Sequence, residues 1–434
     1  MNPSSSGSHD AAREARKGAS IIMPFNRRQF LSGAAAVAGA AAVPMPALAA
    51  SKPIRIGLLA DLSGPLAEGG IQMKQGLTAY LKSKNFTLAG YRIDLVIGDT
   101  GSSPAQAKNK IQELVERDHV DFIVGPLAAF EMFAVNAYVV QHKVPTLCLA
   151  GADNLTQRQP NPYLVRDSAT SSQAMHVMGD YAAKKLGLKR VITIDSDFAF
   201  GYEQEGGFQQ VFQARGGCVV KKLWSPLGTV DFTPYLAQIR DCDGVCQGYA
   251  GAAPVQFMKQ YAQFGLKLPV CGGETAGDDA LLPHFGDYAI GMISACPYTI
   301  GYPGEANKTF IALMKKYFDS VPGFYAAGTY MDGMVIEAAL KSLQGDVSDP
   351  ARTVQALRAV KLEHTPRGPF GFDHFGNAVG NIYVRRIEKV GGKLTNVTLE
   401  TYKNISQFWP YPEATYLKQP AYSRSWPPVA ACKA

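Results

Sequence analysis

The amino-acid sequence predicts an α/β protein of two lobes, each built on a parallel central sheet, with a ligand cleft between them. Continuous apolar runs, which are typical of buried parallel strands, alternate with amphipathic segments of helical length. The pattern starts again after about residue 170, with no low-complexity linker between the halves. Because ligands of open α/β sheets bind beyond the carboxyl ends of the strands, two such lobes place their loops around one cleft.

The first 49 residues predict a leader for export. Arg27-Arg28 precedes a mild apolar run, and Ala47-Leu48-Ala49 suits a signal peptidase, so we expect a twin-arginine (Tat) signal that is cleaved near Ala49. The run is shorter than the about 20 apolar residues that span a bilayer, which disfavours a membrane anchor. Met23 stands where such a signal would begin, so the sequence leaves open whether translation starts at Met1 or Met23. We expect the mature protein in the periplasm.

The first half predicts strands at residues 54–60, 92–98, 120–125 and 144–150, with helices after the first three. The segment "GDTGSSP" (98–104) resembles the active-site loop of an aspartic protease, but that chemistry needs a second Asp-Thr/Ser-Gly, which the sequence lacks. Ser102 or Ser103 followed by Pro104 instead predicts a helix start. Asp99 is therefore expected to be structural.

The second half repeats this order. We expect strands at 190–196, 218–224, 244–251, 266–273 and 289–295. The helices between them are expected at 172–186, 200–216 and 254–265, with a further one that begins near Asp231.

Composition and motifs narrow the function. The formal net charge is +7, and much of it belongs to the leader, so nothing suggests a nucleic-acid partner. The sequence has neither a Gly-x-Gly-x-x-Gly loop nor a Gly-x-Ser-x-Gly elbow, and its histidines are scattered, so we expect no enzyme, cofactor or metal site. The cysteine number, 7, is odd, and only a Cys242–Cys246 bridge suggests itself, which the sequence leaves open.

Seven segments, taken in order, identify a family. They are "IRIGLLADLSGPLAEGG", "VDFIVGPLAA", "VPTLCLAGADNLT", "PYLVRDSATSSQ", "DSDFAFGYE", "VDFTPYLAQI" and "YAAGTYMDG". From about Ile54 to Leu394 the chain resembles the periplasmic binding proteins of the leucine/isoleucine/valine type, the type I solute receptors of ABC importers. The resemblance implies two Rossmann-like lobes that are joined by three crossovers and close on a ligand. It divides the chain into residues 50–170 with 299–380, residues 171–298 with 381–405, and a C-terminal extension, 406–434, packed on the lobes.

The resemblance also implies a binding site. The loops at 127–130 and 150–152 would hold a ligand carboxylate, and the family's usual hydroxyl groups are replaced there by Ala129 and Gly151. Glu274 would meet a ligand amine, and Phe200 would offer a stacking face. Together with Gly69, these small residues suggest a roomier pocket than one for valine. The expected ligand-binding residues are Ser63, Ala128, Ala129, Phe130, Ala150, Gly151, Ala152, Phe200, Ala250, Glu274 and Tyr325.

The function expected from this resemblance is binding of a branched-chain amino acid or a related small carboxylate for an ABC importer. An aromatic acid is the alternative ligand, and a sensory receptor of the same fold is the alternative class; an enzyme comes third. The expected partners are the ligand and the permease and ATPase subunits of the importer, and the protein is expected to be a monomer.

Overall fold

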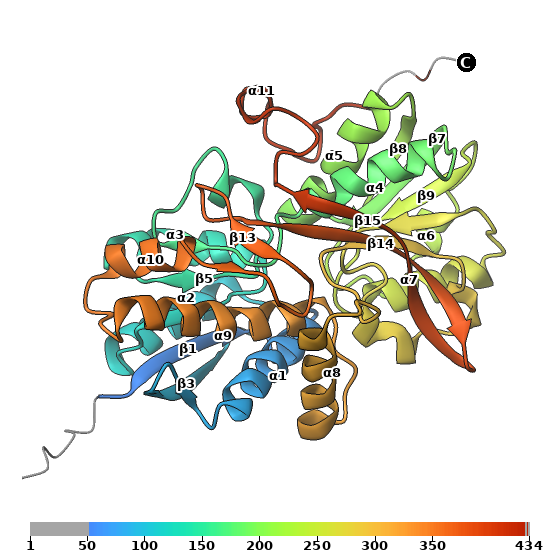
Figure 1. Ribbon diagram of the computed structural model, residues 1–434. Coiled ribbons are helices and arrows are strands. Elements are labelled where there is room, and N and C mark those ends of the chain that lie inside the picture. The colour runs from blue at the N-terminus through green and yellow to red at the C-terminus, as the bar shows by residue number, and fades with distance from the viewer. Residues whose placement is uncertain (1–51, 430–431, 433–434) are drawn as a thin grey trace, which may run out of the picture. The chain divides into compact units, whose positions relative to one another are not determined.

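Two β-sheets organise the residues that the computed structural model describes, 52–429 and 432 (Figure 1). The first sheet has the order β2-β3-β1-β4-β5-β6 and is parallel apart from the β2–β3 hairpin. Its strands are β1 (Ile54–Ala60), β2 (Thr87–Leu88), β3 (Tyr91–Asp99), β4 (Phe122–Val124), β5 (Thr146–Leu147) and β6 (Leu164–Val165). The helices of this lobe are α1 (Ala67–Ser83), α2 (Pro104–Gln112), α3 (Ala129–His142), α8 (Glu305–Phe318), α9 (Phe324–Leu343) and α10 (Pro350–Arg358).

The second sheet has the order β12-β13-β14-β11-β10-β9-β7-β8, and β15 pairs with β14. Its strands are β7 (Arg190–Ser196), β8 (Cys218–Ser225), β9 (Gly244–Gln247), β10 (Val270–Gly272), β11 (Ile293–Cys296), β12 (Lys361–Leu362), β13 (Phe370–Phe372), β14 (Ala378–Val390) and β15 (Lys393–Ile405). The helices of this lobe are α4 (Gln173–Lys184), α5 (Ala199–Ala214), α6 (Thr233–Leu236) and α7 (Ala253–Gln263).

The predicted two-lobed α/β fold is confirmed, although the second sheet is mixed. The chain enters the second lobe after β6 and leaves it after β11. Strands β12 and β13 and the start of β14 belong to the second sheet but pack on the core of the first lobe, and β14 then runs back into the second lobe. Strand β14 pairs antiparallel with β11, β13 and β15, and β14 and β15 form a long hairpin (Figure 1). The mixed pairing arises because β14 re-enters the lobe from the opposite direction and then turns back at a hairpin.

The central strands of each sheet are buried on both faces, which explains why they are apolar. Alternate residues of a strand point to opposite faces, so Ile56 and Leu58 pack into one core with α1 and α9, whereas Leu59 packs into another with α2 and α3. In the second lobe, Val191 and Ile192 divide in the same way between two cores.

The "GDTGSSP" segment forms the helix start that its sequence predicts. Ser103 is the N-cap of α2, and its hydroxyl accepts a hydrogen bond from the Gln106 amide. The Asp99 carboxylate accepts hydrogen bonds from the amides of Leu62 and Gly101, both at 2.9 Å, and so holds the loop after β1 in place. Helix α6, in contrast, is only one turn long, although its preceding Asp231 still accepts a hydrogen bond from the Thr233 amide.

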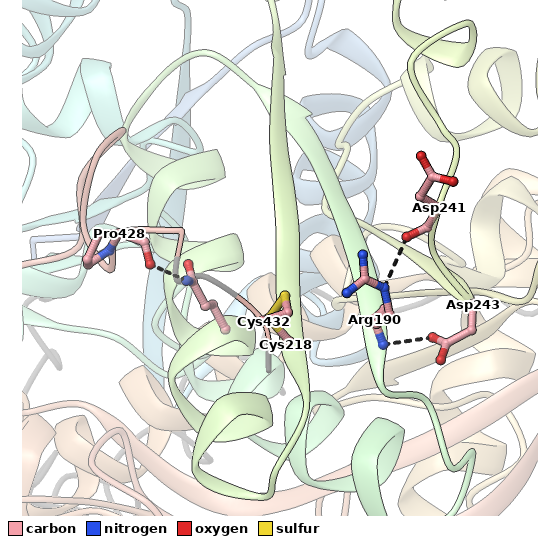
Figure 2. Close-up of a disulfide and its surroundings, with 7 residues drawn as sticks. Arg190, Cys218, Asp241, Asp243, Pro428 and Cys432 are labelled. Atoms are coloured by element: carbon pink, nitrogen blue, oxygen red, sulfur yellow. Dashed lines mark hydrogen bonds between the residues drawn. A yellow bond between two sulfur atoms is a disulfide. The ribbon is translucent and has the colours of Figure 1, made fainter. Parts of the chain in front are cut away.

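A disulfide joins Cys218 of β8 to Cys432, across 214 positions of sequence (Figure 2). The Cys242–Cys246 bridge does not form: Cys246 is buried within β9, and both thiols are free. The sequence spacing could not reveal the pair that forms, because its members meet only through the path of the C-terminal extension.

The C-terminal extension contacts both lobes and contains the short helix α11 (Glu413–Leu417). Arg158 of the first lobe donates hydrogen bonds to the carbonyls of Tyr416 and Gln419. Lys222 of β8 donates to the Pro427 carbonyl at 2.7 Å. The leader and its expected cleavage site lie outside the described residues, and within the described part of the chain no helix is long and apolar enough to cross a bilayer.

Candidate functional site

A pocket lies between the lobes, at the carboxyl ends of both sets of strands. The first lobe contributes the loops after β4 and β5 and the first turn of α9, and the second contributes the loops after β7, β9 and β10. The lining residues are Leu66, Leu127, Ala128, Ala129, Leu149, Gly151, Ala169, Phe198, Phe200, Ala250, Glu274, Phe324 and Tyr325.

Most of the residues expected in the site line this pocket. Loops that are far apart in the sequence come together here because parallel strands end at one edge of each sheet. The expected residues found in the lining are Ala128, Ala129, Gly151, Phe200, Ala250, Glu274 and Tyr325.

Four expected residues lie outside the lining. The Ser63 side chain is exposed and donates a hydrogen bond to Asp99 at 3.0 Å, so it supports a loop instead of facing the pocket. Phe130 contacts the ring of Phe198, with 5.6 Å between centroids. The carbonyls of Ala150 and Ala152 accept hydrogen bonds from the buried Arg166 guanidinium, and the Ala150 amide donates to the Pro126 carbonyl.

The pocket also contains residues that sequence reasoning missed. Phe198 precedes α5 and stacks with Phe200 at 6.0 Å between ring centroids. Leu66, Leu149, Ala169 and Phe324 complete the apolar walls. Because they follow strands or precede helices, their positions in the sequence could have indicated pocket residues. An apolar residue at such a position is, however, equally typical of a hydrophobic core.

The extra pocket volume that the sequence predicts beside the small residues is partly filled by neighbouring side chains. Gly69 lies in α1, where an added Cβ would sit 2.7 Å from Leu127 Cδ1 and 2.9 Å from Tyr325 Cε2. An added Cβ at Gly151 would lie 2.5 Å from the Ser171 hydroxyl. Neighbouring side chains therefore fill the space that these glycines leave, which corrects the inference of a larger pocket from Gly69 and Gly151.

Helix N-termini from both lobes reach the pocket, and those of α3 and α5 lack a side-chain cap. Ala128 is the N-cap of α3, Phe198 is the N-cap of α5, and neither makes a side-chain cap hydrogen bond. The first amides of a helix lack intrahelical partners and carry the positive end of the helix dipole. These two ends favour a negatively charged group in the pocket.

Glu274 is the only acidic residue in the lining, and it is 2 % exposed. Burial raises the pKa of its carboxyl to about 8, and the negative charge of Asp153 acts in the same direction; the Glu274 amide, Gln204 and Arg385 oppose the shift. Its Oε2 atom has no hydrogen-bond partner. At neutral pH Glu274 is therefore mainly a neutral acid that can donate one hydrogen bond.

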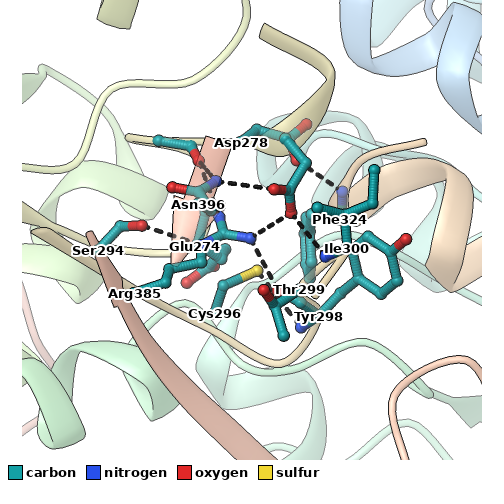
Figure 3. A network of polar contacts seen from close by, with 12 residues as sticks. Glu274, Asp278, Ser294, Cys296, Tyr298, Thr299, Ile300, Phe324, Arg385 and Asn396 are labelled. Atoms are coloured by element: carbon teal, nitrogen blue, oxygen red, sulfur yellow. Dashed lines mark hydrogen bonds and ion pairs between the residues drawn. The ribbon is translucent and has the colours of Figure 1, made fainter. Parts of the chain in front are cut away.

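A buried arginine holds the loop that carries Glu274 (Figure 3). Arg385 of β14 donates hydrogen bonds to the carbonyls of Glu274 at 3.2 Å and Gly277 at 3.1 Å, and it pairs with Asp279 at 2.7 Å. Asn396 of β15 donates to the same Gly277 carbonyl at 2.8 Å. The long hairpin thus fixes this part of the pocket wall.

The groups arranged here are suited to binding a small ligand through noncovalent contacts. The lining combines apolar and aromatic side chains with backbone donors and one neutral acid, and it contains no arginine, lysine or histidine. Within residues 52–429 and 432, no group of His, Cys, Asp and Glu side chains is placed to hold a metal ion.

Comparison with known families gives two matches. A family profile described as periplasmic binding protein matches residues 53–393, and one described as a twin-arginine translocation pathway signal sequence matches residues 24–44. A Leu/Ile/Val-binding protein homolog 6 from Brucella melitensis biotype 1 is 29% identical over 363 residues, covering 81% of this chain and 92% of that protein.

Solved structures agree with this assignment. A solute-binding protein of an ABC transporter from Rhodopseudomonas palustris BisB5, in complex with 3,4-dihydroxybenzoic acid, has a TM-score of 0.78 and 34% identity, covering 82% of this chain and 98% of that one. Another, from Rhodopseudomonas palustris HaA2 with p-hydroxybenzoic acid, has a TM-score of 0.77 and 29% identity, covering 82% and 99%.

Proposed function

The chain belongs to the periplasmic binding protein family, and from that premise we propose that its ligand is an aromatic carboxylate without an amino group. It is a Tat-exported periplasmic protein and the substrate-binding component of an ABC transporter. The sequence favours a branched-chain amino acid first and an aromatic acid second. From the composition of the pocket we infer the opposite order. The permease and ATPase subunits of an importer are its proposed partners.

The single observation that carries the proposal is the pairing of aromatic walls with a neutral acid. Phe198, Phe200, Phe324 and Tyr325 supply flat apolar surfaces from both lobes, which suit a ring. The raised pKa of Glu274 leaves it protonated at neutral pH, so it can donate to a ligand carboxylate.

The ligand carboxylate has suitable donors. The uncapped N-termini of α3 and α5 provide backbone amides and a favourable dipole. In the low dielectric of a closed cleft such hydrogen bonds to a charged group are among the stronger ones, although no cation lines the pocket. The bound hydroxybenzoic acids of the two Rhodopseudomonas palustris proteins support the same ligand class.

An α-amino acid fits less well. Its ammonium group would require an ionised Glu274, and burial works against that form. An ammonium group also offers three donors, whereas Glu274 is the only acidic side chain in the lining.

Titration calorimetry tests the proposal with 4-hydroxybenzoate, phenylalanine and leucine. We expect 4-hydroxybenzoate to bind the wild type and leucine not to bind. Phe200→Ala should weaken 4-hydroxybenzoate binding about tenfold, because the loss of one aromatic contact and its buried area amounts to roughly 1–2 kcal/mol. Tight binding of leucine, with no binding of 4-hydroxybenzoate, would establish the amino-acid alternative instead.

A further inference from the structure

Asp278 belongs to the second lobe, yet its carboxylate is bound by the first (Figure 3). Its Oδ1 accepts a hydrogen bond from the Phe324 amide, the first residue of α9, at 2.7 Å. Its Oδ2 accepts one from Gln72 Nε2 of α1 at 3.1 Å. The side chain is 1 % exposed and does not line the ligand pocket.

The contact between Asp278 and α9 is closely fitted. A Cβ at Gly323, the N-cap of α9, would collide with the Asp278 carboxylate. Gly323 itself has no side chain to cap this 20-residue helix, so the carboxylate from the other lobe takes that place. The next residues of the same helix turn, Phe324 and Tyr325, line the pocket.

The backbone around Asp278 is anchored in the second lobe. Arg385 and Asn396 bind the neighbouring Gly277 carbonyl and the Asp279 carboxylate. The Asp278 side chain, in contrast, makes no cap hydrogen bond for the short 3₁₀ helix that follows it. Both side-chain hydrogen bonds of Asp278 thus come from the first lobe, whereas in its own lobe the positive charge of Arg385 favours the ionised carboxylate.

We infer that Asp278 is a latch: an affinity-determining residue outside the pocket, whose carboxylate caps α9 across the cleft only when the lobes are closed. When the lobes separate, water solvates the carboxylate and the α9 amide separately. A contact that exists in the closed form alone stabilises that form, and it raises the apparent affinity for any ligand that the closed form binds.

Four substitutions test whether Asp278 acts as this latch. Asp278→Ala removes the acceptor, whereas Asp278→Asn keeps an oxygen for the Phe324 amide and loses the charge. Gln72→Ala removes one donor on the first lobe, so that a double-mutant cycle with Asp278→Ala isolates their coupling. Asp287→Ala is the matched control, because Asp287 is exposed and pairs with Lys389 inside the second lobe.

The affinity measurement rests on the proposed function and uses 4-hydroxybenzoate as the probe. We expect Asp278→Ala to weaken binding at least about tenfold, Asp278→Asn to weaken it less, and Asp287→Ala to leave it unchanged. Without ligand, the melting temperature of Asp278→Ala should stay within about 2 °C of the wild type, because the open form lacks the contact. Unchanged affinity in Asp278→Ala would overturn the latch. So would a loss in the free energy of unfolding, measured without ligand, that is as large as the loss in the free energy of binding.

A second measurement needs no ligand. Hydrogen exchange, followed by mass spectrometry, reports on the peptide that begins α9, where the Phe324 amide lies. The unliganded protein is closed for part of the time, and in that form the Asp278 carboxylate holds the Phe324 amide, so exchange there should be up to about twofold faster in Asp278→Ala than in the wild type or in Asp287→Ala. If the wild type does not bind 4-hydroxybenzoate, the proposed ligand is wrong, and this exchange difference alone decides for or against the latch.

Discussion

Ligand affinity should fall with rising pH, because Glu274 must keep its proton to donate to a ligand carboxylate. The pKa of about 8 means that the neutral fraction falls from about nine-tenths at pH 7 to about one-tenth at pH 9. If only the neutral form binds, affinity for an aromatic carboxylate should fall about tenfold over that range, which corresponds to about 1.4 kcal/mol.

The sign of this dependence separates the two ligand classes. The carboxyl group of an aromatic acid is already ionised above pH 6, so Glu274 is the pocket group expected to titrate on binding. An amino acid would need the ionised form of Glu274, and its affinity would rise between pH 6 and pH 8. The two hypotheses thus predict opposite slopes in the same titration.

Calorimetry with benzoate between pH 6 and pH 9 is the appropriate assay, since benzoate has no phenol that titrates in this range. Glu274→Gln is the control, because its amide still donates a hydrogen bond and cannot ionise. We expect the variant to bind with an affinity that does not change with pH. An affinity of the wild type that rises with pH, or the same fall in Glu274→Gln, would refute the assignment of a neutral Glu274.

Three further changes have defined outcomes. Cys432→Ser opens the disulfide to Cys218; loop entropy for 214 positions gives an upper limit of about 5 kcal/mol, so calorimetric melting should occur several degrees lower and no longer respond to reductant. Gly151→Ser should reduce both stability and ligand affinity, by about 1–3 kcal/mol of overpacking against Ser171, and unchanged melting and binding would contradict the fit seen there. Replacing Arg27-Arg28 by two lysines should abolish the processed periplasmic form on immunoblots, whereas undiminished export would exclude the Tat route.

Much of the fold could be predicted because its signals are local. The apolar runs at 54–60 and 190–196 are strands with those same bounds, β1 and β7. Ser103 caps α2 as its sequence context indicates. The export signal is also a linear pattern, and a family profile matches it at residues 24–44. Strand periodicity, capping and signal motifs depend on neighbours in the chain, so they can be read without the tertiary structure.

The site was predictable only as a set of loops. Glu274 and Phe200 line the pocket as expected, because a residue after a parallel strand must lie at the carboxyl edge of its sheet. Ser63 lies in such a loop as well, but its hydroxyl is bound to Asp99, and the space beside Gly69 is filled by Tyr325. Side-chain direction within a loop depends on contacts that are distant in sequence.

Only the tertiary structure determined which segments far apart in the chain lie against one another. By itself the sequence determined the class of fold, the order of most strands and helices, and the export route. It did not determine that Cys218 would meet Cys432, that the β14–β15 hairpin would brace the Glu274 loop, or that Asp278 would cap a helix of the other lobe. Each of these contacts joins groups whose distance is set by how whole lobes pack, and no local propensity encodes that distance.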